Sequence, residues 1–201
     1  MHPNPAFRQE PDSRSLAFAR DRAFGTLIAG GAEPLLSHVP FLLSEDGATA
    51  EMHLVRSNPI ARAGGGAAIL AVTGPDAYVS PDWYGVADQV PTWNYVAVHL
   101  HGRLEPLPED GLRAHLDRLS AAQEGRLLPK PPWTSAKMTP DVLARMMRQI
   151  VPFRLIVEEV RATWKLSQNK PRDVRLRAAD RLAGRGDTAM AALVRGDITQ
   201  A

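Results

Sequence analysis

Strand-like segments follow one another closely through the first half of the chain, and this succession constrains the fold more than any other feature of the sequence. The longest covers residues 92–107, "TWNYVAVHLHGRLEPL", where Val96, Val98 and Leu100 alternate with small or polar residues. Alternation of this kind is typical of a strand with one buried face. Shorter segments of strand-like composition, joined by short turns, cover residues 24–30, 34–43, 49–56, 68–74 and 77–80.

Helical patterns lie mostly outside this run of strands. The expected helices cover residues 12–23, 109–123, 140–150, 171–184 and 187–196, and one more strand is expected at residues 153–168. The strands are consecutive in the sequence, and most helices come in its second half. This order predicts an α+β fold, in which an antiparallel barrel or sheet carries peripheral helices. Pro40 lacks a backbone N–H, so its strand is expected at a sheet edge or with a bulge.

The composition is that of one globular domain and excludes several chemistries. The chain has 201 residues, 44% of them hydrophobic, a formal net charge of +2 and no cysteine. Disulfides, thiolate nucleophiles and Cys-ligated metals are therefore excluded, and a reducing cytoplasmic location is expected. The proline-rich N-terminus does not resemble a signal peptide, and no apolar run approaches the roughly 20 residues that span a bilayer. The small net charge does not indicate a nucleic-acid partner.

Common catalytic motifs are missing. The glycine cluster "GGGA" at residues 64–67 lacks the third glycine of a dinucleotide fingerprint and the Gly-Lys of a P-loop. Neither G-x-S-x-G nor H-E-x-x-H occurs. His99 and His101 share one strand face, but two ligands do not make a metal site, so none is predicted.

Three stretches combine hydrogen-bonding groups with charge or flat rings. "HLVRSNP" ends a strand with Arg56, a residue type that pairs bidentately with phosphate. "PTWNY" and "WKLSQNK" add indole rings, amides and two lysines. Each stretch alone also fits an ordinary loop, core or strand end. Together they favour a flat, anionic ligand with a phosphate tail.

The sequence resembles the PaiB-type family of FMN-binding negative transcriptional regulators. The resemblance rests on segments that occur in the family's order: "HPNPAFR", "FGTLI", "SHVPFLL", "MHLVRSNP", "TGPDAYVSPDWY", "VPTWNYVAVHLHGRL", "PPW" and "WKLSQNK". It implies a homodimeric antiparallel split β-barrel, similar to pyridoxamine-phosphate-oxidase-like barrels, with FMN between the subunits. A single FMN-binding domain is expected over residues 1–201, in which residues 171–201 form a helical C-terminal extension.

The resemblance also implies which residues contact FMN. Arg56, Ser57 and Asn58 would take the phosphate, and Lys165 would stabilise negative charge on reduced flavin. Trp93 and Asn94 are expected from the partner subunit. The full set of expected contacts is Thr26, Leu27, His38, Val39, Pro40, His53, Arg56, Ser57, Asn58, Trp93, Asn94, Trp164, Lys165, Ser167, Gln168, Asn169 and Lys170.

Three functions remain open at this stage. The first is gene repression by an FMN-binding dimer, as the family name implies, with promoter DNA as a partner. Residues 170–185 hold six basic and two acidic residues, a local charge of +4, but residues 188–196 offer few side chains that read bases. The second is an FMN-dependent oxidoreductase acting on a small substrate. The third is a haem or small-ligand sensor. Whether the protein is an enzyme is left open.

Overall fold

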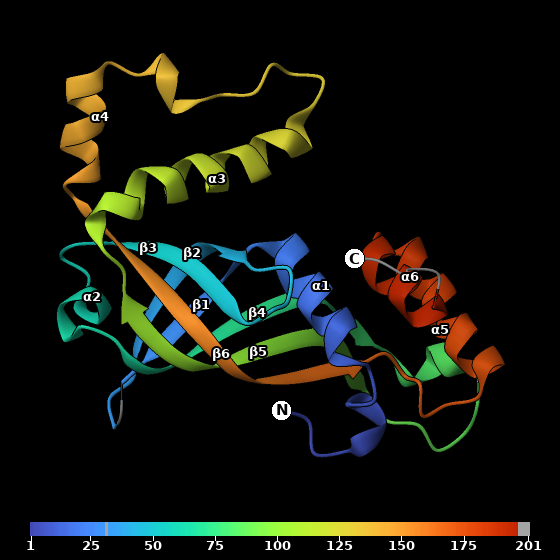
Figure 1. The fold of residues 1–201 in the computed structure, drawn as a ribbon. Coiled ribbons are helices and arrows are strands. Elements are labelled where there is room, and N and C mark those ends of the chain that lie inside the picture. Colours follow the sequence, from blue (N-terminus) through green and yellow to red (C-terminus); the bar gives the residue numbers. More distant parts are fainter. Residues whose placement is uncertain (31, 197–201) are drawn as a thin grey trace. The chain divides into compact units, whose positions relative to one another are not determined.

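The computed structural model describes residues 1–30 and 32–196 (Figure 1). Six strands form a closed barrel in the order β1–β2–β3–β6–β5–β4, which confirms the predicted antiparallel barrel. The strands are β1 (Phe24–Ala29), β2 (Leu35–Leu43), β3 (Thr49–Val55), β4 (Gly66–Val79), β5 (Thr92–Pro106) and β6 (Ile150–Lys165).

Each expected helix is present within a few residues of its predicted bounds. The last five residues of the expected C-terminal extension, 197–201, lie outside the described residues. The helices are α1 (Asp12–Arg22), α2 (Pro59–Ala63), α3 (Leu112–Glu124), α4 (Pro140–Met147), α5 (Arg172–Gly184) and α6 (Thr188–Arg195). Short 3-10 turns are η1 (Pro5–Phe7), η2 (Pro81–Tyr84), η3 (Glu109–Gly111), η4 (Gly125–Leu127) and η5 (Ser135–Lys137).

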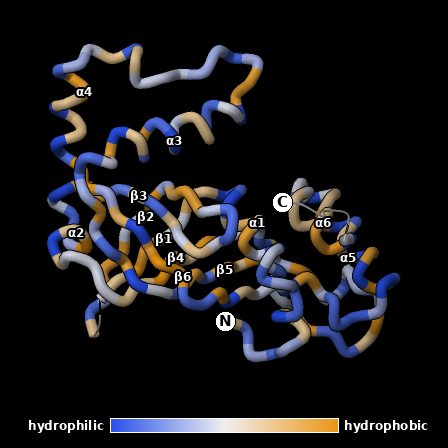
Figure 2. Tube along the Cα trace, viewed as in Figure 1, coloured by the Kyte–Doolittle hydropathy of each residue, from blue (hydrophilic) through white to orange (hydrophobic). Residues whose placement is uncertain are grey.

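The chain divides into two compact units. The central unit comprises residues 23–71 and 100–159. The terminal unit comprises residues 1–22, 72–99 and 160–201. In both units hydrophobic stretches follow the strands, as Figure 2 shows.

The core of the central unit follows from strand alternation. β1 lies between β2 and β4, with Thr26 opposite His38 on one side and Ala71 on the other. β3 lies between β2 and β6, and Met52 pairs with Phe153. Every second side chain therefore points inward. The buried inward residues include Leu27, Val39, Phe41, Met52, Leu54, Leu70, Phe153 and Leu155.

Pro40 does not lie at a sheet edge, because β2 pairs with both β1 and β3 in a closed barrel. Its pairing partner in β1 is Phe24, and the ladder with β3 begins only at Phe41. The backbone amide of Phe41 donates to the Ala23 carbonyl, so it points toward β1. The backbone nitrogen of Pro40, which has no hydrogen to donate, therefore points toward β3, at a position before the first β2–β3 pair. The strand therefore accommodates proline without losing a ladder bond.

The sequence predicted two strands that are separated at Gly74 and Pro75. In the structure both residues lie inside the single long strand β4. A Cβ at position 74 would lie 2.6 Å from the Phe18 ring and 2.9 Å from Val96. Glycine is needed there because α1 and β5 approach the β4 backbone closely. It permits close packing within the terminal unit and does not end the strand.

α3 packs on the outward face of β3 in the central unit, and the chain then runs back along α3 toward α4 (Figure 1). His115 and Arg118 of α3 contact His53 and Glu51 of β3. In the terminal unit, α5 and α6 pack on each other through small and branched residues: Val174, Ala178, Ala179, Leu182, Met190, Ala191 and Val194 are buried. Among the described residues, no helix has the length and apolar character needed to cross a membrane.

Candidate functional site

A pocket of about 240 Å³ opens in the terminal unit where the start of β5, the end of β6 and the N-terminal segment meet. Five of the residues expected to contact FMN line this pocket. The lining residues are His2, Asn4, Phe7, Tyr84, Asp88, Gln89, Val90, Thr92, Asn94, Lys165, Ser167, Asn169 and Lys170. We call it the lysine pocket, after Lys165 and Lys170.

Ser167 is the buried hub beneath the lysine pocket. Its hydroxyl lies 2.9 Å from the Tyr84 hydroxyl and accepts a hydrogen bond from the Asn94 amide at 3.0 Å. Ser167 has a φ of +60°, which lies in the left-handed region and turns the chain directly after β6. Burial also raises the pKa of Tyr84. Three segments far apart in sequence are thus locked together by one hydroxyl.

Two ammonium groups face the pocket. Lys165 Nζ donates to Thr92 Oγ1 at 2.7 Å and lies 5.9 Å from the centre of the Phe7 ring. Burial lowers the pKa of Lys165, because desolvation disfavours its charged form. Lys170 Nζ lies 4.2 Å from the centre of the Tyr84 ring and donates to Gln89. The pocket therefore combines positive charge and amide groups with a lining of buried aromatic rings.

The N-terminal segment forms one wall of the pocket, and the sequence reasoning did not assign it to the site. The backbone amide of His2 donates to Thr163 Oγ1 at 3.1 Å, and Phe7 is buried. Desolvation and the nearby Lys165 charge lower the pKa of His2. The segment "HPNPAFR" contributed to the resemblance, so that motif was the one available signal. The contributions of Asp88 and Gln89 depend on a loop conformation that no motif indicates.

The other expected contacts in the terminal unit are engaged elsewhere. Trp164 is buried, donates from Nε1 to Ser15 at 3.1 Å and packs edge-on against Phe18. Gln168 closes the turn after β6 by accepting from the Leu166 amide. Trp93 is half exposed and donates to Asp76 at 2.9 Å. None of the three lines the lysine pocket.

In the central unit, the expected strand contacts divide by face. Thr26 Oγ1 and His38 Nδ1 lie 3.0 Å apart on the outward face of β1 and β2. Leu27 and Val39 point into the core. Pro40 shares the outward face of β2 with His38, because alternate residues of a strand share a face. Only Thr26, His38 and Pro40 of this set present side chains outward.

The expected phosphate corner is occupied by internal contacts. Arg56 Nε donates to the Arg148 carbonyl at 3.0 Å, and its Nη2 lies 2.9 Å from Glu109. Asn58 caps α2 by accepting from the Ile60 amide, and its own amide donates to Ser37. Ser57 lies exposed between them. The remaining expected contact, His53, faces α3 through His115, at 3.3 Å between their ring nitrogens. The phosphate role of this corner stays a prediction.

Residues 1–159 match a protein-family model described as "Putative FMN-binding domain". The chain is also 32% identical, over 158 residues, to a Bacillus subtilis (strain 168) protein named "Protease synthase and sporulation protein PAI 2". The chain belongs to the PaiB-type family of FMN-binding proteins. The aligned region covers 76% of this chain and 75% of the Bacillus protein, so the likeness extends well beyond one motif.

Solved structures show that the PaiB-type chain has a fold found in other flavin-related proteins. The FAD and heme binding protein from Mycobacterium smegmatis aligns with a TM-score of 0.56 at 18% identity, covering 79% of this chain and 73% of that one. The flavocytochrome Anf3 from Azotobacter vinelandii aligns with a TM-score of 0.51 at 17% identity, covering 78% and 68%. At these identities the likeness concerns the split-barrel fold alone.

FMN is the cofactor of this PaiB-type protein, and the lysine pocket has donors that fit part of it. Its two ammonium groups and neighbouring amides suit an anionic, hydrogen-bonding molecule, and the buried rings of Phe7 and Tyr84 form part of its lining. Its volume of about 240 Å³ is below the roughly 300–1,000 Å³ of pockets that enclose a drug-sized ligand. The pocket is therefore too small to enclose a whole drug-sized molecule. Because the family match ends at residue 159, the role of Lys165 and the following turn rests on geometry.

Proposed function

We propose that this protein is a cytoplasmic, homodimeric negative transcriptional regulator whose ligand is FMN. The observation that carries the proposal is its 32% identity to the Bacillus protein over three quarters of both chains, since that protein is named for protease synthesis and sporulation. The absence of cysteine is compatible with a reducing compartment.

The proposal gives separate tasks to two sets of residues. Asn94, Lys165, Ser167, Asn169 and Lys170 orient the cofactor from the lysine pocket and exclude water from it. Arg56, Ser57 and Asn58 are the proposed phosphate ligands, and binding would require Arg56 to exchange its contact with Glu109 for one with phosphate. FMN, when bound, supplies one- and two-electron chemistry. Lys165 would hold positive charge beside it.

The outward face of β1 and β2 supports the homodimer. Leu36 is 62% exposed and Phe24 is 48% exposed, although both are large apolar residues in well-formed strands. They flank the Thr26–His38 pair, and the Phe24 and His38 rings are stacked with centroids 6.4 Å apart. An apolar sheet face of this kind commonly marks a protein interface. We propose that a second copy covers it.

Flavin absorbance tests the assignment of the lysine pocket. Protein mixed with FMN and then desalted is expected to retain the visible flavin bands. In Lys165→Met the affinity is expected to fall about tenfold or more, because a charge-assisted hydrogen bond contributes about 1.5–3 kcal/mol. Lys137→Met, which changes a lysine outside the pocket, is the matched control. Equal affinity in Lys165→Met and Lys137→Met would remove Lys165 from the site.

Gel-shift measurements test the regulatory role. DNA fragments from upstream of the protein's own gene are expected to bind at low salt, with an affinity that falls steeply as salt is raised. The exposed arginines of α5 are the proposed phosphate contacts, so Arg172→Glu and Arg181→Glu should weaken binding. If no upstream fragment shifts at low salt, with or without FMN, direct repression is ruled out.

An FMN-dependent oxidoreductase is the second candidate. The partly buried Lys165 favours it, because a cation beside a bound flavin stabilises the electron-rich form of the flavin. The expected result is loss of visible flavin absorbance when NADH or NADPH is added without oxygen, with a slower rate in Lys165→Met. Unchanged absorbance with both donors would exclude reduction by nicotinamides.

A further inference from the structure

A second pocket, of about 460 Å³, lies in the central unit between α3 and the proline-rich segment that follows it. It shares no residue with the lysine pocket. Its volume is within the roughly 300–1,000 Å³ typical of small-molecule sites. The lining residues are Arg113, Asp117, Ser120, Ala121, Gly125, Leu128, Pro132, Trp133, Thr134, Ser135 and Ala136. We call it the α3 pocket.

One side of the α3 pocket is apolar and incompletely covered. Leu128 is 66% exposed and Trp133 is 36% exposed, and Ala121 and Pro132 extend the same apolar lining. An indole ring beside aliphatic groups provides a flat surface on which another ring can pack. A ring bound there would remove both large side chains from water, which is favourable at about 25 cal/mol per Å².

The polar side of the α3 pocket is a compact, charge-balanced cluster. Arg113 Nε donates to Asp117 Oδ2 at 2.9 Å, and Arg113 Nη2 donates to Ser135 Oγ at 2.6 Å. The Ser135 hydroxyl donates to the other oxygen of Asp117. These bonds lower the pKa of Asp117, so its carboxylate stays ionised and neutralises Arg113. The cluster therefore presents hydrogen-bonding groups without net charge.

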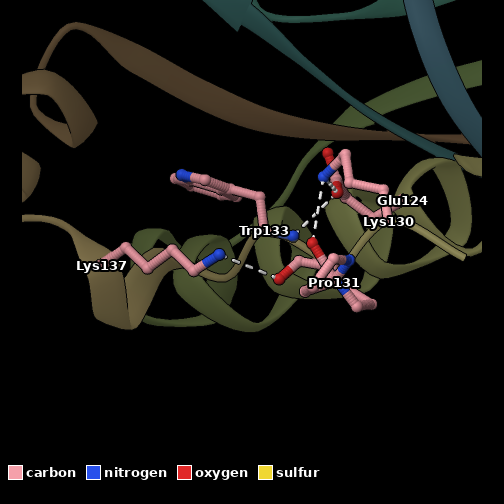
Figure 3. A network of polar contacts seen from close by, with 6 residues as sticks. Glu124, Lys130, Pro131, Trp133 and Lys137 are labelled. Atoms are coloured by element: carbon pink, nitrogen blue, oxygen red, sulfur yellow. Dashed lines mark hydrogen bonds and ion pairs between the residues drawn. The ribbon is translucent and has the colours of Figure 1, made fainter. Parts of the chain in front are cut away.

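Contacts at the end of α3 hold the proline-rich segment in place. Glu124 accepts from the Trp133 backbone amide at 2.7 Å and pairs with Lys130, while Lys137 donates to the Pro132 carbonyl at 3.2 Å (Figure 3). In Figure 3 the backbone nitrogen of Trp133 faces Glu124, and its indole ring extends away from the ion pair. The backbone of Trp133 is thus held in place, while its indole ring makes no part of these contacts.

We propose that the α3 pocket binds a small aromatic molecule that carries an uncharged hydrogen-bonding group such as a hydroxyl or a carboxamide. The ring packs against Trp133 and Leu128, and the polar group reaches the Arg113–Asp117–Ser135 cluster. The paired Arg113 and Asp117 would attract and repel a ligand carboxylate or ammonium about equally, so either ion would meet a like charge and lose hydration without a net attraction. A neutral group that both donates and accepts meets neither cost.

Nuclear magnetic resonance with four matched probes tests the proposal. Benzamide and phenol represent the proposed class, and benzoate and benzylamine are their charged counterparts. In the full-length protein with FMN added, benzamide and phenol are expected to shift the indole N–H signal of Trp133, assigned with Trp133→Phe. The charged probes should bind at least tenfold more weakly.

Two neighbouring alanines of α3 provide the control. Both alanines are exposed, but only Ala121 lines the pocket, so Ala121→Leu fills the pocket and Ala122→Leu makes the same change outside it. Ala121→Leu should reduce probe affinity at least tenfold, and Ala122→Leu should retain it. FMN absorbance should be unchanged in both variants. The proposal is overturned if no probe shifts Trp133, if the charged probes bind as well as the neutral ones, or if both variants lose binding equally.

Discussion

At the scale of single residues, the structure separates groups that pack in the core from groups that line a pocket, even where they are neighbours in the chain. Trp164 and Lys165 are consecutive in β6, yet the indole is buried against α1 while the ammonium lines the lysine pocket. Successive side chains of a strand point to opposite faces, so adjacent residues take different roles. Trp164 is therefore a core residue, whereas Lys165 is the proposed cofactor contact.

Ser167 gives the first prediction at this scale. Ser167→Ala removes the hydroxyl that joins Tyr84 and Asn94 and leaves two buried polar groups with fewer partners. We expect a loss of about 1–3 kcal/mol in the free energy of unfolding, measured with urea. Ser13→Ala, at an exposed position of α1, should change stability much less. A Ser167→Ala protein as stable as wild type would show that this hub does not hold the terminal unit together.

At the scale of elements, close backbone approach fixes how strands pack. A Cβ at Gly102 in β5 would lie 1.8 Å from the Ile156 carbonyl oxygen in β6, so any side chain forces the two strands apart. We expect Gly102→Ala to destabilise the protein by about 3 kcal/mol in urea unfolding.

The matched control is Gly184→Ala at the end of α5, where a Cβ meets nothing within 4 Å and φ is not positive. There alanine should be neutral or stabilising by up to about 1 kcal/mol, because it restricts the unfolded chain. Similar losses in both variants would contradict the steric account.

The contact between β3 and α3 predicts a pH dependence. Burial lowers the pKa of both His53 and His115, and Glu51 and Arg118 complete the charged groups around the pair. The unfolded chain takes up protons near the ordinary value of 6.5, while the folded pair resists them. Stability is thus fully present above this pH and is lost as the pH falls through the lower folded values.

Urea unfolding between pH 8 and pH 5 measures this effect. The free energy of unfolding should decline below about pH 6.5 in the wild type, since model imidazoles titrate there. In the double variant His53→Gln, His115→Gln the decline should be shallower. An identical slope in both proteins would show that other groups set the pH dependence.

At the scale of the whole molecule, the exposed apolar face of β1 and β2 predicts self-association. Leu36→Lys puts a charge on the proposed interface, and burying an unpaired charge is costly. Sedimentation should show the wild type as a dimer and Leu36→Lys as a monomer at the same concentration. Met146→Lys, at an exposed position on α4, should remain dimeric. A dimeric Leu36→Lys protein would place the interface elsewhere.

The sequence determined much of this protein by local physics. Alternation in residues 92–106 predicted β5 and its buried face, because the pleat of a strand repeats every two residues. The spacing of Leu112, Leu116 and Leu119, which matches the turn of a helix, predicted α3 by the same kind of argument. Ordered motifs indicated the family and its cofactor. Strands, helices and motifs depend on residues that are close together in the chain, so they can be predicted from the sequence.

Tertiary structure decided which of the indicated residues line a pocket. The low strand preference of glycine predicted a strand break at Gly74. Only the close approach of Phe18 explains why a glycine is needed inside β4. The lysine pocket gathers His2, Tyr84 and Lys170, and the α3 pocket gathers Arg113, Ala121 and Trp133. Such groups meet because strands and helices pack in three dimensions. No local sequence pattern predicts a contact between side chains that are distant in the chain.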